Sequence, residues 1–196
     1  MRNPIQKRLA NLESWQQIVF MACLCERMYP NFAMFCQITE QPQQAKIYHN
    51  ILNLVWEYLT VKDANINFEH QLEKLEAVIP DINDYDFFGI VPAVDACEAL
   101  SDLLHTIIAG ESLEQAVKVS VLSLQTVVAL LETEENREFS EKELKDNPLI
   151  SDELDVQWAI YRTLNELEKR DIEVINGLKN EIRATKISNI GIEINN

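Results

Sequence analysis

The chain has few of the residues that interrupt helices. Its 196 residues include four glycines and six prolines, and most of these fall between long segments with helical periodicity. Four glycines, so widely spaced, cannot form the glycine-rich phosphate loops G-x-G-x-x-G or G-x-x-x-x-G-K. Both nucleotide-binding motifs are therefore excluded. The esterase motif G-x-S-x-G is also absent.

Basic residues are also scarce. Lys and Arg together number 17 against 32 Asp and Glu, which gives a formal net charge of −15. Nucleic acids and anionic membranes are bound largely through clustered Lys and Arg, and the sequence has no basic run that could form a local patch. We therefore expect neither nucleic acid nor a membrane surface as a partner.

No membrane span or targeting signal is visible. The longest uninterrupted apolar run, Ile18 to Cys25, is far shorter than the ~20 residues that a spanning helix needs. The N-terminal residues are charged and lack the apolar core of a signal peptide. The four cysteines are consistent with buried thiols in a reducing compartment. These features predict a cytoplasmic protein.

The segment Leu12 to Tyr29 is the one around which we expect the chain to fold. Between Ile18 and Cys25 it has no polar residue for two helical turns, so no side of this helix is suited to solvent. We predict a central helix that is buried on all sides. Pro30 is expected to end it, and Asn31 to cap a short helix that follows.

The remaining pattern predicts an all-α, single-domain bundle of about seven helices over residues 1–196, with an extended tail at 185–196. A capping box at Ser112 and another at Ser140 each predict a helix start, and Glu166 and Arg170 are expected to pair across one turn. The other expected elements are an opening helix from Pro4, helices over 45–60, 68–79, 92–108, 113–135 and 151–184, a stop at Gly110 and a turn closed by Pro148.

Several motifs together are similar to those of one bacterial family. They are L-E-S-W-Q-Q, C-E-R-M-Y-P-N-F, L-T-V-K-D-A, V-P-A-V-D-A-C-E-A-L and S-N-I-G-I. In this order they resemble the YjaG-like family over essentially the whole chain, from Pro4 to Ile192. The resemblance implies an all-helical cytoplasmic domain. It implies no activity, since the family is a domain of unknown function without agreed catalytic residues.

Two groups of residues have the chemistry of metal ligands. Cys23 and Cys25 are two residues apart, so on a helix their side chains point ~200° apart and cannot share one metal. The second group lies on one helical stripe, with spacings of 3, 4 and 3 residues, and consists of Asp95, Glu98, Asp102 and His105.

The D-x-x-H step of that stripe is similar to the Glu-x-x-His step of di-iron bundles, which needs a second such step on a facing helix. Neither His49 nor His70 supplies one, because Lys46 and Asn67 stand at the required acidic positions. We therefore predict a polar face on an amphipathic helix. No metal, cofactor or catalytic residue is assigned.

Glu26 and Arg27 are the strongest chemical clue, because they follow the buried run directly. Buried charges must be paired or reach a water-filled crevice. We expect Arg27 to bind a carboxylate or helix carbonyls, and Glu26 to bind an Arg or Lys. The segment Asp81–Gly89 has two possible roles: its aromatic residues either close the bundle end or form a recognition surface.

Two hypotheses for the function follow. The favoured one is a binding or regulatory module that acts through a surface, with an unidentified protein partner or self-association. The alternative is a small-molecule-binding protein or enzyme with a polar site at the bundle end, built from Glu26, Arg27 and the stripe that begins at Asp95, with a carboxylate and histidine metal site as one form of it. The first predicts an exposed apolar patch, and the second predicts a pocket that gathers ionisable groups with shifted pKa values.

Overall fold

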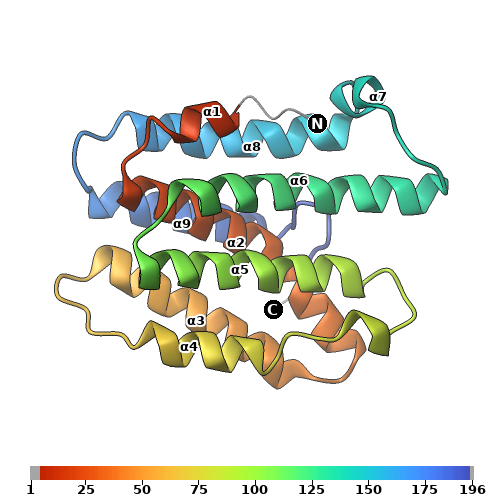
Figure 1. The fold of residues 1–196 in the computed structure, drawn as a ribbon, viewed down its shortest axis with the longest axis horizontal. Helices are drawn as coiled ribbons and strands as arrows, with labels where there is room; N and C mark the ends of the chain where they lie inside the picture. Colours follow the sequence, from red (N-terminus) through yellow and green to blue (C-terminus); the bar gives the residue numbers. More distant parts are fainter. Residues whose placement is uncertain (1–4, 195–196) are drawn as a thin grey trace.

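The computed structural model describes residues 5–194, which are helical apart from turns, loops and one isolated β-bridge (Figure 1). Pro4, the expected start of the first helix, lies outside the described residues. The described part confirms the all-α bundle. Its elements are α1 (Ile5–Leu9), α2 (Ser14–Ile38), α3 (Pro42–Thr60), α4 (Phe68–Glu76), η1 (Ile82–Asp84), α5 (Ile90–Ala109), α6 (Leu113–Glu135), α7 (Glu141–Lys145), α8 (Pro148–Asn165) and α9 (Ile172–Thr185).

Helix α2 is the centre of the bundle. It contacts α3, α5, α6, α8 and α9, and in Figure 1 it passes behind α5 and α6 through the middle of the molecule. Every residue from Val19 to Cys25 has 0% exposed area, and Ile18 has 8%. Each large apolar side chain buried in this way contributes ~1.5–3 kcal/mol. The prediction of a helix buried on all sides is confirmed.

The predicted end of this helix at Pro30 is wrong. Pro30 lies inside α2, and Asn31, the expected cap of a new helix, lies inside it too. Proline has no N–H, so the carbonyl of Glu26 cannot receive its usual helical hydrogen bond from residue 30, at a cost of ~3 kcal/mol. The helix continues because Phe32 and Phe35 beyond the proline are buried in the core.

The predicted helix over 151–184 is two helices. Helix α8 ends at Asn165, and α9 begins after Asp171, whose side chain accepts hydrogen bonds from the backbone N–H groups two and three residues on. The apolar spacing continues across the intervening loop, which hid the break in the sequence. Glu166 and Arg170 stand in this region rather than on one helical face, so the expected pairing across a turn is wrong.

The helix ends confirm some of the predicted caps and correct others. Gly110 has φ 79° and ends α5, and Ser140 forms the expected capping box of α7. Ser112 does not cap α6, because its hydroxyl donates instead to Gln17 Oε1 at 2.5 Å. Pro148 does not close a turn but begins α8.

The C-terminal residues 187–194 form a turn that we call the C-terminal hook. A single antiparallel bridge joins Ile187 to Glu193, and Ser188 and Asn189 at the bend are buried. The tail after α9 is thus non-helical, as predicted, but it turns back on itself instead of running straight. Its last two residues lie outside the described part. The hook folds back because its polar bend finds hydrogen-bond partners in the bundle.

The acidic and aromatic segment before α5 packs on the end of α2. The ring of Phe35 lies edge-on to Tyr85, with centroids 4.9 Å apart, and is stacked against Phe87 at 5.9 Å. Gln41 donates to the Tyr85 hydroxyl at 3.1 Å. Of the two roles considered for this segment, closing the bundle end is the one these contacts support.

Helix α6 is long and apolar enough to cross a bilayer by length and composition, although 44% of its most apolar window is buried inside the protein. Core helices meet the same criterion. Its hydroxyl side chains Ser120, Ser123 and Thr126 are buried. Ser120 and Ser123 donate to Gln157 and Glu153 on α8, and Thr126 donates to Asp95 on α5. We therefore describe α6 as a core helix.

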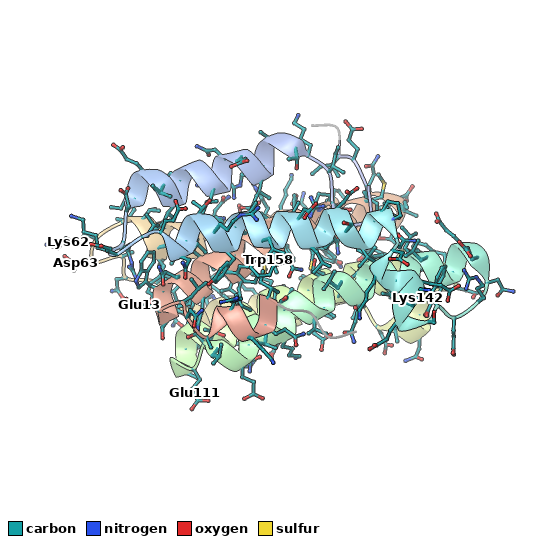
Figure 2. The ribbon with its side chains drawn as sticks, turned by 90° about the horizontal axis from the view of Figure 1, so that it is seen from above. Glu13, Lys62, Asp63, Glu111, Lys142 and Trp158 are labelled. Atoms are coloured by element: carbon teal, nitrogen blue, oxygen red, sulfur yellow. The ribbon has the colours of Figure 1, made fainter. Side chains whose placement is uncertain are left out.

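Seen from above, α9 and α8 lie on the opposite side of the bundle from α5 (Figure 2). In the same view Lys142, on α7, lies at the opposite end of the molecule from Glu13 and Lys62. The bundle therefore has two ends, and α9 covers one of its sides. Two recesses in the surface of this bundle are candidate binding sites.

Candidate functional site

Glu26 binds an arginine from the far end of the chain. Its Oε1 accepts hydrogen bonds from Arg183 Nε at 2.7 Å and Trp56 Nε1 at 2.7 Å, and Arg183 Nη2 also contacts it. Nη2 further donates to Asn53 Oδ1 at 2.7 Å. Glu26 is buried. The expected pairing with a basic residue is confirmed, and it joins α2 to α3 and α9.

Arg27, the next residue, points to a different partner. Its Nε lies 2.5 Å from Oε2 of Glu153, whose side chain is 0% exposed. The other oxygen, Oε1, accepts from Ser123 at 2.6 Å and more weakly from Gln157 at 3.4 Å. The predicted carboxylate partner of Arg27 is therefore confirmed. Adjacent charges on α2 are therefore neutralised by different helices, Glu26 by α9 and Arg27 by α8.

The C-terminal hook is attached to this network. Asn189 donates to the carbonyl of Ser123 at 2.8 Å, and its Oδ1 accepts from Asn31 Nδ2 at 2.9 Å. All three side chains are buried. Since buried amides are costly without partners, these bonds hold the hook against α2 and α6.

A recess of about 300 Å³ opens where Pro30 interrupts the hydrogen bonds of α2. We call it the Pro30 pocket. The residues that line it come from α2, α3, α9 and the hook, and are Glu26, Tyr29, Pro30, His49, Ile182, Arg183, Lys186, Ile187 and Ile194. Five of the nine carry ionisable groups. The proline that the sequence suggested as a helix end therefore marks the wall of a pocket.

The aromatic wall of the Pro30 pocket has shifted ionisation. Tyr29 and His49 are stacked, with ring centroids 5.1 Å apart and an interplanar angle of 28°. Burial, followed by the positive field of Arg183, lowers the pKa of His49 below its ordinary value, while burial raises that of Tyr29. Both rings are therefore neutral at pH 7 and available as hydrogen-bonding groups.

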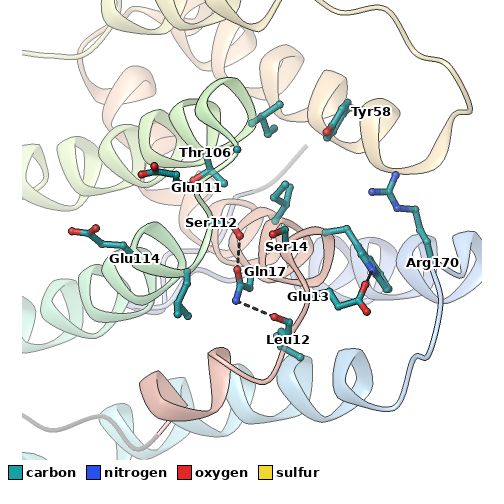
Figure 3. Close-up of a pocket in the computed structure, with 15 residues that line it drawn as sticks. Leu12, Glu13, Ser14, Gln17, Tyr58, Thr106, Glu111, Ser112, Glu114 and Arg170 are labelled. Carbon is teal, nitrogen blue, oxygen red and sulfur yellow. Dashed lines mark hydrogen bonds between the residues drawn. The ribbon is translucent and has the colours of Figure 1, made fainter.

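A larger and shallower groove, of about 910 Å³, lies between the starts of α2 and α6 (Figure 3). Gln17 at its floor donates to the carbonyl of Leu12 at 3.1 Å and accepts from Ser112. Its carboxylates, Glu13, Glu111 and Glu114, are all exposed. The polar groups at the floor are satisfied by one another and the charges are in solvent, so this groove gathers no buried ionisable group.

The stripe on α5 does not form a metal site. Asp95 accepts from Thr126 at 2.8 Å, and Lys118 binds Asp102 at 2.9 Å and Glu98 at 3.7 Å, so all three of its acids are engaged with α6. Glu98 and His105 are exposed. Among residues 5–194 no group of three or more His, Cys, Asp or Glu is arranged to hold a metal ion. The stripe was expected to be a polar face, but its three acids bind residues of the neighbouring helix α6.

The cysteines are core residues. Cys23, Cys25, Cys36 and Cys97 are all free and buried, and burial raises the pKa of each thiol, that of Cys36 to about 12. They are buried thiols, as the sequence indicated, and their raised pKa values keep them protonated and unreactive at pH 7.

The sequence did not reveal most of the residues that line the pocket or that bind its charged groups. Arg183 is 157 residues from Glu26, and no local pattern connects them. His49 was considered only as a metal ligand, and Asn53 and Trp56 only as positions in a helix. The one available signal in the sequence was Arg183, a charged residue that directly follows Ile182 of the apolar stripe near the end of α9.

Fold and site together define an all-helical bundle whose buried central helix carries a small charged pocket. The chain belongs to the DUF416 family, whose model, described as "Protein of unknown function (DUF416)", matches residues 4–193. The resemblance to the YjaG-like family is thereby confirmed, and with it comes no assigned activity.

Three relatives support this assignment. The chain is 67% identical to an "Uncharacterized protein" of Haemophilus influenzae, over 98% of each chain. It is 55% identical to "Uncharacterized protein YjaG" of Escherichia coli, over 98% of this chain and 97% of that one. The crystal structure of a DUF416 family protein from Shewanella baltica has a TM-score of 0.89 at 30% identity, covering 98% of this chain and 100% of that one.

Proposed function

We propose that this protein binds a small molecule in the Pro30 pocket. The observation that carries the proposal is the convergence of Glu26, Tyr29, His49 and Arg183, from three helices, in one recess. Pockets of ~300 Å³ and above that gather ionisable groups with shifted pKa values are typical of binding sites. Here the shifts arise from burial of His49 and Tyr29.

The competing hypothesis, a module that acts through a surface, predicts a contiguous exposed apolar patch. In the described part of the chain the large exposed apolar side chains lie at helix ends or just beyond them: Ile38, Val61, Ile82, Phe87, Ile108, Leu113, Leu149, Ile172 and Ile187. A partner helix would instead need an apolar stripe along a groove. This distribution favours the pocket.

We propose binding rather than a reaction. Nucleophilic catalysis needs a hydroxyl or thiol hydrogen-bonded to a base. Among the described residues that line the pocket there is no Ser, Thr or Cys, and the four thiols of the chain are buried in the core. The groups that are present can hold a ligand by charge, hydrogen bonding and stacking.

The test is a fragment screen followed by protein-observed NMR. Ile187 and Ile172 are similarly exposed, at 43% and 47%, but only Ile187 lines the pocket. Ile187→Trp should therefore obstruct it, and Ile172→Trp is the matched control. We expect fragments that shift the amide signals of Tyr29, His49 and Arg183 in the parent and the control, and not in Ile187→Trp.

Two results would overturn the proposal. One is a screen, covering anionic, neutral and cationic fragments, in which no compound shifts these amides. The other is a set of hits that bind Ile187→Trp as well as they bind the parent.

A further inference from the structure

We infer that the ligand of the Pro30 pocket carries a carboxylate or phosphate group, bound by Arg183 and Lys186, attached to a small apolar body. This inference rests on the proposed function and adds the chemical class of the ligand. It is carried by the charges, the unused donors and the apolar lining of the pocket.

The charge of the pocket is opposite to that of the protein. The chain has a net charge of −15, yet the pocket is lined by the cations Arg183 and Lys186 and a single carboxylate, Glu26. Lys179, one helical turn before Arg183, adds to the same field, since both lower the pKa of His49. A positive recess in an acidic protein favours an anion over a cation.

Two other acids lie nearby: Glu181, two residues before Arg183, and Glu193, which pairs with Ile187 in the hook. Both side chains are exposed, and neither lines the pocket. Solvent therefore screens their charges more strongly than that of the buried Glu26. The local excess of positive charge remains.

Both cations retain unused hydrogen-bond donors. Arg183 uses Nε and Nη2 to bind Glu26 and Asn53, and its Nη1 makes no hydrogen bond within residues 5–194. Nor does the Lys186 ammonium bind any side chain in that part of the protein. Glu26 and Asn53 fix the guanidinium plane, so they act as positioning residues. A preoriented guanidinium suits carboxylate or phosphate recognition.

The rest of the lining is apolar or aromatic. The apolar part consists of Pro30, Ile182, Ile187 and Ile194. The aromatic part is the stacked pair of rings, Tyr29 and His49. The volume of about 300 Å³ is at the lower end for ligand pockets. These features fit a small amphiphilic anion, with its charged group at α9 and its body against the isoleucines.

The experiment uses benzoate, phenyl phosphate, benzyl alcohol and benzylamine, titrated at constant ionic strength and followed through the amide signals of Arg183 and Lys186. At least one anion should bind with a dissociation constant ~10-fold or more below that of benzyl alcohol, as charge-assisted bonds allow. The preference between the two anions decides between carboxylate and phosphate. Lys186→Gln should weaken anion binding by ~5–10-fold.

The matched control is Lys142→Gln, which removes the same charge on α7, a helix that contributes nothing to the pocket (Figure 2). It should leave anion affinity unchanged. If benzyl alcohol or benzylamine binds the same residues as tightly as the anions, the anion inference is overturned and the pocket remains a binding site. If neither these probes nor any fragment of the screen shifts the pocket amides, the proposed function fails as well.

Discussion

Arg27 and Glu153 form the most buried ion pair in the described part of the protein, and its energetic role can be tested by removing one charge. Their side chains are 13% and 0% exposed, and the Nε–Oε2 distance is 2.5 Å. Arg27→Met preserves much of the length of the side chain but removes its charge. Glu153 would then be a buried carboxylate whose remaining partners, Ser123 and Gln157, are neutral.

Breaking a buried pair from one side typically costs ~3–5 kcal/mol, because the other charge stays desolvated. We expect the loss of unfolding free energy in Arg27→Met to fall in this range. This is a large part of the ~5–15 kcal/mol by which a folded domain is typically stable. Adding Glu153→Gln removes the orphan charge and retains an acceptor for Ser123. The double variant should therefore recover at least half of the loss.

The assay is urea unfolding followed by far-ultraviolet circular dichroism, with free energies from linear extrapolation. Arg170→Met, at an exposed arginine, is the control and should change stability by less than ~0.5 kcal/mol. The reasoning is refuted if Arg27→Met costs less than ~1 kcal/mol, or if the double variant is no more stable than the single one.

Three further outcomes are expected. Ala22→Asp buries a charge at a position with 0% exposure and should leave the protein insoluble or molten. Its control, Gln125→Asp at an exposed site, should cost under ~1 kcal/mol of stability. Equal melting temperatures of the two variants would contradict this expectation. Burial raises the pKa of Asp95 to about 6, above the ~3.9 of an unfolded chain, so its contribution to stability is lost as pH rises through that range. Asp95→Asn should thus add about 1–2 kcal/mol at pH 7, after allowance for its partial exposure, and almost nothing at pH 4 in urea unfolding. The four buried thiols should not react with Ellman's reagent until the protein unfolds, and rapid labelling of the native state would show that a thiolate is accessible.

The local patterns of the sequence were sufficient for the central helix and the fold class. The run from Ile18 to Cys25 has no residue suited to solvent, and burial on all sides follows directly. Gly110 and Ser140 mark ends that depend only on backbone conformation and nearby side chains. Such features are determined within a few residues, so they can be predicted.

The predictions from sequence failed where contacts between residues far apart in the chain outweighed a local preference. Pro30 does not end α2, because packing on both sides of it compensates for one missing hydrogen bond. Ser112 uses its hydroxyl for Gln17 rather than for its own helix. The partner class of Glu26 was predictable, since a buried carboxylate needs a donor. The identity of that partner, Arg183, depends on how α9 packs against α2 and was not predictable.

A crystal structure of the protein with the tightest-binding anionic fragment tests the central claim most directly. We expect the ligand in the Pro30 pocket, with its anionic group ~2.7–3.2 Å from Arg183 Nη1 or Lys186 Nζ and its apolar part against Ile182. A ligand bound instead in the groove beside Gln17, with the Pro30 pocket empty, would contradict it.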